Sequence, residues 1–383
     1  MAAAPGGMTE AVPDVIGLDR AALDRARISR DPRFDGKFFI AVTSTGIYCR
    51  PICPSRSSKS VNVRYYATAA EAAEAGFRPC LRCRPEAAPG SPAWLGTSAV
   101  VRRALRLIEN GALDRASLDA LAAGVGIGPR HLRRLFLQHL GASPMTVART
   151  RRVHFAKRLL DDTRLPITQI ALAAGYGSLR RFNAAFKEVY GRPPRELRRG
   201  KSGATDEVII RLAYRPPYDW EQVRAFLARC AVVGVERVDE RSYTRTVPSD
   251  DGDATVTIRP IDDEPALELR IAGAAPRDLL PLTSTVRRVF DLGADPARIA
   301  EAFDGDPLLG PLVRARPGVR IVGIWDPGAG DLDGADEGLR LALGDPDAFP
   351  ATDRVLRRFA ARAEAWRPWR GYAAFHLWNA ARG

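Results

Sequence analysis

Four cysteines arranged as two close pairs constrain the fold of this 383-residue chain more than any other feature. Three residues separate Cys49 from Cys53, two separate Cys80 from Cys83, and 26 residues lie between the pairs. This spacing can bring four thiolates to one tetrahedral ion, and four thiolates without a histidine favour zinc. We therefore predict a small domain folded around Zn²⁺. On spacing alone, the site is either a closed structural centre or one whose metal-bound thiolate is a nucleophile.

The residues around the cysteines resemble the metal-binding module of the Ada family of adaptive-response proteins. The resemblance covers about residues 18–86 and is carried by the segments Phe34–Phe39, Thr45–Cys53 and Gly76–Pro85. In that family the first cysteine of the set irreversibly takes a methyl group from a methylated DNA phosphate, and this position is Cys49. The resemblance also implies contacts with the DNA backbone from Thr45, Arg50, Arg56 and Arg78.

The resemblance implies that methylation of Cys49 is both a repair and a signal. Four thiolates on one dication leave a formal charge near −2, and coordination keeps the thiolates deprotonated. Methylating Cys49 removes one negative charge that faces the DNA, so the phosphate backbone repels the module less. The alternative is that Cys49 is only a zinc ligand in a regulator without transfer chemistry.

The charge is concentrated in the middle of the chain. The whole chain has a formal net charge of +13. Residues 91–201 contribute +14, from 21 basic and 7 acidic residues, whereas residues 202–383 contribute −5, from 24 basic and 29 acidic residues. The middle third is therefore predicted to be the main footprint for double-stranded DNA.

The composition favours a cytoplasmic protein associated with the nucleoid. No apolar run approaches the roughly 18 residues that span a bilayer, so no membrane partner is expected. The first residues lack the charged and apolar regions of a secretory signal. Free thiolates for a metal also fit a reducing compartment.

The chain is expected to be a multidomain α+β protein, with breaks at residues 87–92 and 200–204. The expected parts are a zinc-binding methyl-acceptor domain, an all-α double helix-turn-helix domain, an antiparallel-sheet α+β domain and a short helical remnant. Their predicted boundaries are 15–88, 94–200, 206–326 and 338–383.

The middle domain contains an internal repeat. The segment Ala122–Gly126 recurs as Ala173–Gly177, and Phe136, Gly141 and Pro144 recur as Phe186, Gly191 and Pro194. Each copy is a short apolar helix, a glycine turn and a second helix, which predicts two helix-turn-helix units. The pair resembles the AraC family of transcription regulators. A monomer with two such units can bind neighbouring turns of one groove, and RNA polymerase is an expected partner of an activator.

The second helix of each unit carries the candidate DNA contacts, because its exposed side chains can reach base edges or phosphates. They are Arg130, His131, Arg133 and Arg134 in the first copy, and Arg180, Arg181 and Asn183 in the second. A solvated helix face is the alternative for each. Phe182 and Phe186 are expected to be buried. Arg151, Arg152, Lys157 and Arg158 on the connecting helix are expected either to contact phosphates or to lie on a solvated face.

The last third alternates apolar and polar residues, as at 254–258 and 267–271, with helical stretches between. This pattern predicts an antiparallel sheet covered by helices. Up to about Trp325 it resembles the amino-terminal domain of the AlkA family of DNA glycosylases. The family's helix-hairpin-helix is absent, and resemblance resumes only at Leu341. Cys230 is predicted to be a small buried residue.

Two residues of the remnant match the family's glycosylase site. The resemblance makes Asp353 the aspartate that supports loss of a damaged base, and Trp378 an aromatic of the base pocket. The last third is net acidic and lacks the hairpin that grips DNA, so we expect the glycosylase activity to be lost. Asp353 is then an ordinary surface or helix-capping residue.

Together these features predict an alkylation-responsive repair protein and transcription activator that is a stoichiometric DNA methyltransferase, with Cys49 as the methyl acceptor. Two alternatives stay open: a bifunctional protein that also excises alkylated bases such as 3-methyladenine, and a purely zinc-stabilised regulator.

Overall fold

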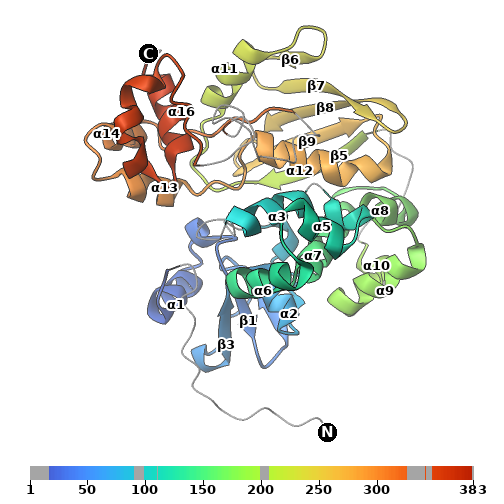
Figure 1. Ribbon diagram of the computed structural model, residues 1–383. Coiled ribbons are helices and arrows are strands. Elements are labelled where there is room, and N and C mark those ends of the chain that lie inside the picture. The colour runs from blue at the N-terminus through green and yellow to red at the C-terminus, as the bar shows by residue number, and fades with distance from the viewer. Residues whose placement is uncertain are drawn as a thin grey trace.

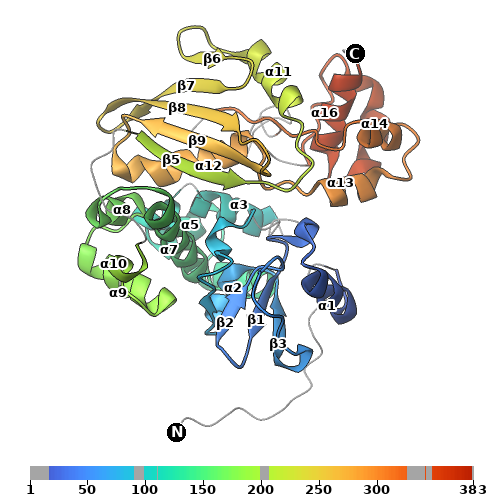
Figure 2. The same ribbon diagram turned by 180° about the vertical axis from the view of Figure 1, so that it is seen from behind.

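The chain forms two stacked halves (Figures 1 and 2). The computed structural model describes residues 17–89, 99–109, 111–198, 207–325, 341 and 347–381. One half holds the large sheet and the C-terminal helices, and the other holds the zinc module (residues 17–89) and the helical domain (residues 99–198). The predicted multidomain α+β architecture is confirmed. Among the described helices, none combines the length and apolar character needed to cross a membrane.

The zinc module is a small mixed sheet between two helices. Its elements are α1 (Arg20–Ser29), β1 (Phe39–Val42), β2 (Ile47–Cys49), β3 (Val63–Tyr66), α2 (Ala69–Glu74) and β4 (Arg78–Pro79). The strand order is β3-β1-β2-β4, in which β2 and β4 are parallel and the other pairs are antiparallel. Leu23 and Phe38 fill one face of the sheet, and Tyr48 with Ala72 fills the other.

The helical domain contains both predicted helix-turn-helix units. Its helices are α3 (Ala99–Glu109), α4 (Ala112–Arg115), α5 (Leu118–Gly124), α6 (Pro129–Leu140), α7 (Pro144–Asp162), α8 (Ile167–Ala173), α9 (Leu179–Tyr190) and α10 (Pro194–Leu197). The units are α5–α6 and α8–α9, and α7 joins them. Each tight turn uses a glycine with positive φ, Gly126 at 75° and Gly175 at 76°. Phe182 and Phe186 are fully buried, as predicted.

The third domain, which we call the sheet domain (residues 207–325), is built on five antiparallel strands in the order β5-β9-β8-β7-β6. The strands are β5 (Glu207–Ala213), β6 (Glu236–Val238), β7 (Tyr243–Ser249), β8 (Gly252–Pro260) and β9 (Ala266–Ala272), and its longest helices are α11 (Trp220–Cys230) and α12 (Leu279–Val289). Alternate residues Val208, Ile210 and Leu212 are buried. This period of two confirms the predicted half-buried strands.

The C-terminal segment (residues 347–381) packs on the sheet domain. It consists of the 3₁₀ helix η5 (Leu356–Trp366) and α16 (Arg370–Ala380), which lie beside α13 (Pro296–Phe303) and α14 (Leu309–Ala315) (Figure 1). Trp366 Nε1 donates to Asp306 at 2.8 Å, and the Tyr372 hydroxyl donates to Asp291 at 2.9 Å. The remnant therefore buries its apolar side chains. Residues 90–92 of the break predicted at 87–92, all of the break predicted at 200–204, and residues 326–340, before the point where the AlkA resemblance resumes, lie outside the described residues.

The prediction for Cys230 is wrong, because its side chain is exposed. Val223 and Leu227 form the buried face of α11. Cys230 would continue that face, but the helix ends there and the chain turns into a loop where Val233 is 96% exposed.

The connecting helix α7 binds the zinc module through buried charges. Lys157 contacts Asp161 at 2.5 Å and Glu86 at 3.8 Å, and Arg158 donates to the Glu86 carbonyl oxygen at 2.5 Å. From the zinc module, Arg84 reaches Asp161 at 3.0 Å. Lys157 and Arg158 are 3% and 8% exposed. The expectation that these two cations contact phosphates or lie on a solvated face is therefore wrong. Both are buried, Lys157 beside Asp161 and Glu86, and Arg158 against the Glu86 carbonyl oxygen.

A second contact joins α7 to the strand that leads into the first cysteine. The Tyr48 hydroxyl and His154 Nε2 share a hydrogen bond of 2.8 Å. Burial lowers the pKa of His154 to about 3, so the imidazole is neutral at physiological pH.

Replacing Leu356 by Ala tests whether the C-terminal segment is part of the folded core. Leu356 is fully buried, so we expect the substitution to lower the free energy of unfolding by about 2–5 kcal/mol. Urea unfolding measures this change. Val233→Ala, at an exposed position, is the control, and equal effects of the two substitutions would contradict the packing described.

The pH dependence of stability tests the His154 contact. Because the folded pKa lies below the unfolded value, the contribution of His154 is complete above about pH 6.5 and is lost as the pH falls towards 3. Between pH 7 and 5.5, the wild type should therefore lose about 1 kcal/mol more stability than His154→Gln. Urea titrations at both pH values measure this difference. His131→Gln, at an exposed histidine of α6, is the matched control, and identical pH slopes for wild type and His154→Gln would refute the contact.

Candidate metal centre and nucleic-acid interface

The four cysteines meet at one end of the small sheet. Cys49 ends β2 and Cys80 follows β4, and these neighbouring strands run parallel, so both ligand loops leave the sheet at the same edge. The Cys80 amide donates to the Tyr48 carbonyl oxygen at 2.9 Å and fixes this register. All four Sγ atoms lie within 4.8 Å of one another. The predicted ligand set Cys49, Cys53, Cys80 and Cys83 is thus assembled.

The donor set fits Zn²⁺. Four sulfur ligands at this spacing suit one tetrahedral ion. Four thiolates this close cannot all ionise without a positive charge between them. The cluster therefore calls for the predicted cation, which when bound keeps the thiolates deprotonated.

The two halves of the cluster differ in accessibility. Cys80 and Cys83 are 8% and 7% exposed, whereas Cys49 and Cys53 are half-buried. The Cys83 sulfur also accepts a hydrogen bond of 3.3 Å from the Arg50 amide. An electrophile from outside can therefore reach the first pair more easily than the second.

Arg50 braces the cluster. Its guanidinium binds both carboxylate oxygens of Asp35 and donates to the Cys83 carbonyl oxygen at 3.1 Å. The side chain is only 12% exposed. A DNA contact from Arg50 stays a prediction, and its observed partners lie within the protein.

The other candidate backbone contacts of the zinc module are exposed. Thr45 lies in the turn between β1 and β2, Arg56 in the loop after Cys53, and Arg78 on β4. Their exposure is compatible with phosphate contacts, which stay predictions.

The candidate residues of the helix-turn-helix units lie on α6 and α9, both on the side of the helical domain away from the large sheet (Figures 1 and 2). The exposed members are Arg130, His131, Arg133, Arg134, Arg180 and Arg181. Asn183 is half-buried. The Ser178 hydroxyl caps α9 and starts the helix just before Arg180.

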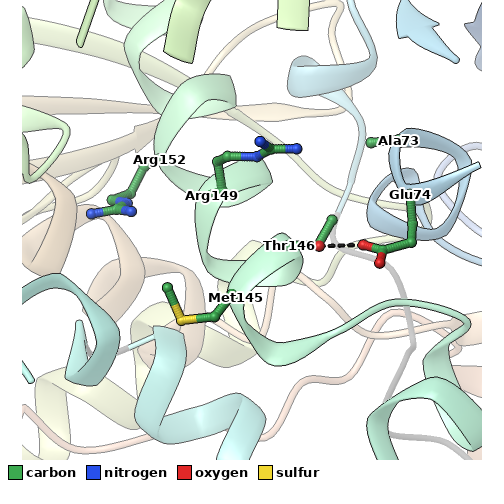
Figure 3. A pocket seen from close by; sticks show the side chains of 6 residues that line it. All are labelled: Ala73, Glu74, Met145, Thr146, Arg149 and Arg152. Atoms are coloured by element: carbon green, nitrogen blue, oxygen red, sulfur yellow. Dashed lines mark hydrogen bonds between the residues drawn. The ribbon is translucent and has the colours of Figure 1, made fainter. Parts of the chain in front are cut away.

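A groove between the zinc module and the helical domain is lined by Ala73, Glu74, Met145, Thr146, Arg149 and Arg152 (Figure 3). Thr146 donates to Glu74 across it. Arg149 pairs with Glu188 at 2.7 Å, and the Arg152 guanidinium lies 5.0 Å from the centre of the Tyr176 ring. Both guanidiniums thus have protein partners, and we assign no ligand to this groove.

Asp353 and Trp378 lie together. Asp353 Oδ1 accepts hydrogen bonds from the amides of Val355 and Leu356, at 2.8 and 3.1 Å, and from Trp378 Nε1 at 2.9 Å. Asp353 thus accepts hydrogen bonds from amides at the start of η5, and its part in a glycosylase site or as a helix-capping residue stays a prediction. The indole N–H of Trp378 is engaged in the same contact.

Several residues that organise the site were not identified from the sequence. Asp35, Lys37 and Glu86 are buried charges. A signal existed for Lys37, because a lysine between Phe34 and the Phe38–Phe39 pair indicates a buried ion pair. The partners come from distant segments, and no local pattern identifies them.

Comparison with known proteins agrees with this architecture. Three family models match: the metal binding domain of Ada at residues 22–86, a helix-turn-helix domain at 121–200 and the AlkA N-terminal domain at 209–326. The chain is 41% identical over 304 residues to the probable bifunctional transcriptional activator/DNA repair enzyme AlkA of Mycobacterium tuberculosis, covering 78% of this chain and 61% of that protein.

Two further relatives match shorter parts of the chain. Identity is 36% over 210 residues to the bifunctional transcriptional activator/DNA repair enzyme Ada of Escherichia coli, covering 55% of this chain and 54% of that protein. It is 33% over 176 residues to AdaA of Bacillus subtilis, covering 45% of this chain and 80% of that protein. The chain thus spans less than two thirds of the AlkA and Ada relatives. It spans four fifths of AdaA. It belongs to the Ada family of bifunctional transcriptional activator and DNA repair proteins.

Proposed function

We propose that this protein takes a methyl group from a methylphosphotriester of DNA onto Cys49, and that the methylated protein binds promoter DNA as a transcription activator. One observation carries the proposal. The four sulfurs converge within 4.8 Å, and the first ligand, Cys49, belongs to the accessible pair, whereas Cys80 and Cys83 are buried.

The transfer is a single displacement. The Cys49 thiolate attacks the methyl carbon of the phosphotriester, a C–S bond forms, and the C–O bond to phosphate breaks. The electron pair of that bond stays on oxygen, so the phosphate regains its anionic diester form and Cys49 becomes a neutral thioether. The protein is consumed in a stoichiometric reaction. Exposed Arg56 and Arg78 are proposed to hold the flanking phosphates.

Residue exposure favours the first pair, Cys49 and Cys53, over the second. Burial covers Cys80 and Cys83, and the Arg50 amide donates to the sulfur of Cys83. Such a hydrogen bond stabilises a thiolate and makes it less nucleophilic. Cys53 is the remaining accessible sulfur, and family resemblance selects Cys49 between the two.

The helix-turn-helix units supply the proposed response. Their basic side chains on α6 and α9 are exposed on one side, and the net charge of residues 91–201 is +14. Loss of one negative charge at Cys49 would weaken the repulsion between the zinc module and DNA. We propose that the activator acts as a monomer with RNA polymerase as its partner in the cytoplasm.

No observation favours base excision as a second function. The carboxylate of Asp353 accepts three hydrogen bonds within the protein, one of them from the indole of Trp378. All three bonds hold Oδ1 at the start of η5, and base excision is left out of the proposal.

Intact-mass measurement after incubation with methylphosphotriester DNA tests the proposal. We expect the mass to rise by one methyl group, and peptide mapping to place it on Cys49. The experiment should use a Cys230→Ser background, because that exposed thiol is a competing acceptor for alkylating reagents.

Cys49→Ser and Cys53→Ser are the paired variants. Transfer should vanish in both if zinc is lost, so zinc content must be measured alongside. A methyl group found on Cys53 would reassign the acceptor. An unmodified protein with zinc bound would overturn the proposal and favour the purely zinc-stabilised regulator.

A further inference from the structure

A buried polar contact joins the zinc module directly to the sheet domain. The contact is made by residues 35–37, in the loop between the 3₁₀ helix η1 (Pro32–Phe34) and β1. Asp35 and Lys37 are each 6% exposed. These residues belong to a segment typical of the zinc module, yet the Lys37 side chain and the Asp35 carbonyl oxygen have partners in the sheet domain.

An ion pair forms the first part of this contact. Lys37 Nζ lies 2.7 Å from Asp295 Oδ2, and the two side chains are 7% and 1% exposed. Asp295 also caps α13 by accepting a hydrogen bond from the Arg298 amide at 3.4 Å. Replacing one partner would therefore leave the other as an uncompensated buried charge in the contact between the two surfaces, which is strongly destabilising.

Arg215 forms the second part. This side chain is 2% exposed and donates from Nε to the Asp35 carbonyl oxygen at 3.1 Å. Its Nη1 donates to the carbonyl oxygens of Gly293 and Ala294, at 3.0 and 3.3 Å. The guanidinium thus ties the loop before α13 to the loop of the zinc module.

The loop can approach this closely because Gly36 lies at its centre. Gly36 has a φ of +72°, and a Cβ there would lie 2.2 Å from the Pro89 carbonyl oxygen and 3.2 Å from Arg215 Nη2. A side chain at this position would therefore clash with backbone and strain the turn.

The contact continues to the metal centre through Asp35. The Asp35 carbonyl oxygen faces Arg215, while its carboxylate holds the Arg50 guanidinium. Arg50 in turn donates to the sulfur and the carbonyl oxygen of Cys83. One residue thus links the sheet domain to the cysteine loops.

The sheet domain also packs on the helical domain. A single hydrophobic cluster includes Phe182 and Phe186 of the second helix-turn-helix unit together with Val208 of β5. Arg151 of α7 donates to the Ser284 hydroxyl of α12 at 3.2 Å. The sheet domain therefore contacts both the zinc module and the helical domain, which Figure 2 shows beneath it.

We propose that the sheet domain serves as an internal dock that holds the zinc module in a fixed position relative to the helix-turn-helix units, with Arg215 and Asp295 as positioning residues for Cys49. The docking stands on the contacts alone. Its effect on methyl transfer rests on the proposed function. The dock gives the sheet domain a role that requires no glycosylase chemistry.

Hydrogen exchange of the full-length protein tests the docking. The substitution Asp295→Asn removes the negative charge and keeps the shape of the side chain. Because Lys37 is then left unpaired, the rate of amide exchange across residues 34–39 should rise by about tenfold or more. Exchanging the partners in Lys37→Asp/Asp295→Lys should restore much of the protection. Asp262→Asn, which breaks an exposed pair with Arg241 in the same domain, is the matched control. Wild-type exchange in Asp295→Asn would overturn the dock.

Two methyl donors, both tested in the Cys230→Ser background, separate positioning from metal binding. With zinc content unchanged, Asp295→Asn and Arg215→Lys should react with methyl iodide at the wild-type rate, because this small electrophile needs only the thiolate. Transfer from methylphosphotriester DNA should slow by about tenfold. Equal rates from DNA in wild type and variants would overturn the positioning role.

The two proposals fail in different ways. If the wild type takes no methyl group from DNA, the proposed function fails while the exchange experiment still reports on docking. If the wild type is methylated and Asp295→Asn keeps wild-type exchange, the proposed function stands and the dock fails.

Discussion

The convergence of four sulfurs on one edge of a small sheet is the constraint on which the rest of the structure depends. Parallel pairing of β2 with β4 brings Cys49 and Cys80 to the same edge, and short turns add Cys53 and Cys83. Four thiolates at this distance require a dication. The segments that flank the ligands, Tyr48 before Cys49 and Arg84 after Cys83, both bind α7. The metal centre is therefore built into the junction between the zinc module and the DNA-binding helices.

The charges of that junction change how the positive middle third is understood. Lys157 and Arg158 contribute to its net charge, yet both are buried, Lys157 beside Glu86 and Asp161, and Arg158 against the Glu86 carbonyl oxygen. The charge available to DNA is concentrated instead on α6 and α9, whose arginines are exposed. A sum over the sequence therefore counts the buried cations of the connecting helix together with the exposed cations of α6 and α9.

Short sequence patterns predicted those features of the fold that residues close together in the sequence determine. Cysteine spacing predicted the ligand set, the glycine-centred repeat predicted both helix-turn-helix units, and alternation predicted the large antiparallel sheet. The failures concern long-range partners. Burial of Lys157 depends on Glu86, which lies 71 positions away in the sequence, and exposure of Cys230 depends on where α11 ends. Trp366 likewise binds Asp306, between α13 and α14, and this partner of the C-terminal segment could not be predicted from the residues of the segment itself.

The central claim is that the methylation state of Cys49 controls DNA binding. The most direct test measures the affinity of the full-length protein for promoter DNA before and after methylation of Cys49, at two salt concentrations. We expect the methylated protein to bind at least about tenfold more tightly, because one negative charge facing the phosphates is gone. Arg180→Ala should reduce the affinity of both forms. Equal affinities of the methylated and unmethylated proteins would contradict the account.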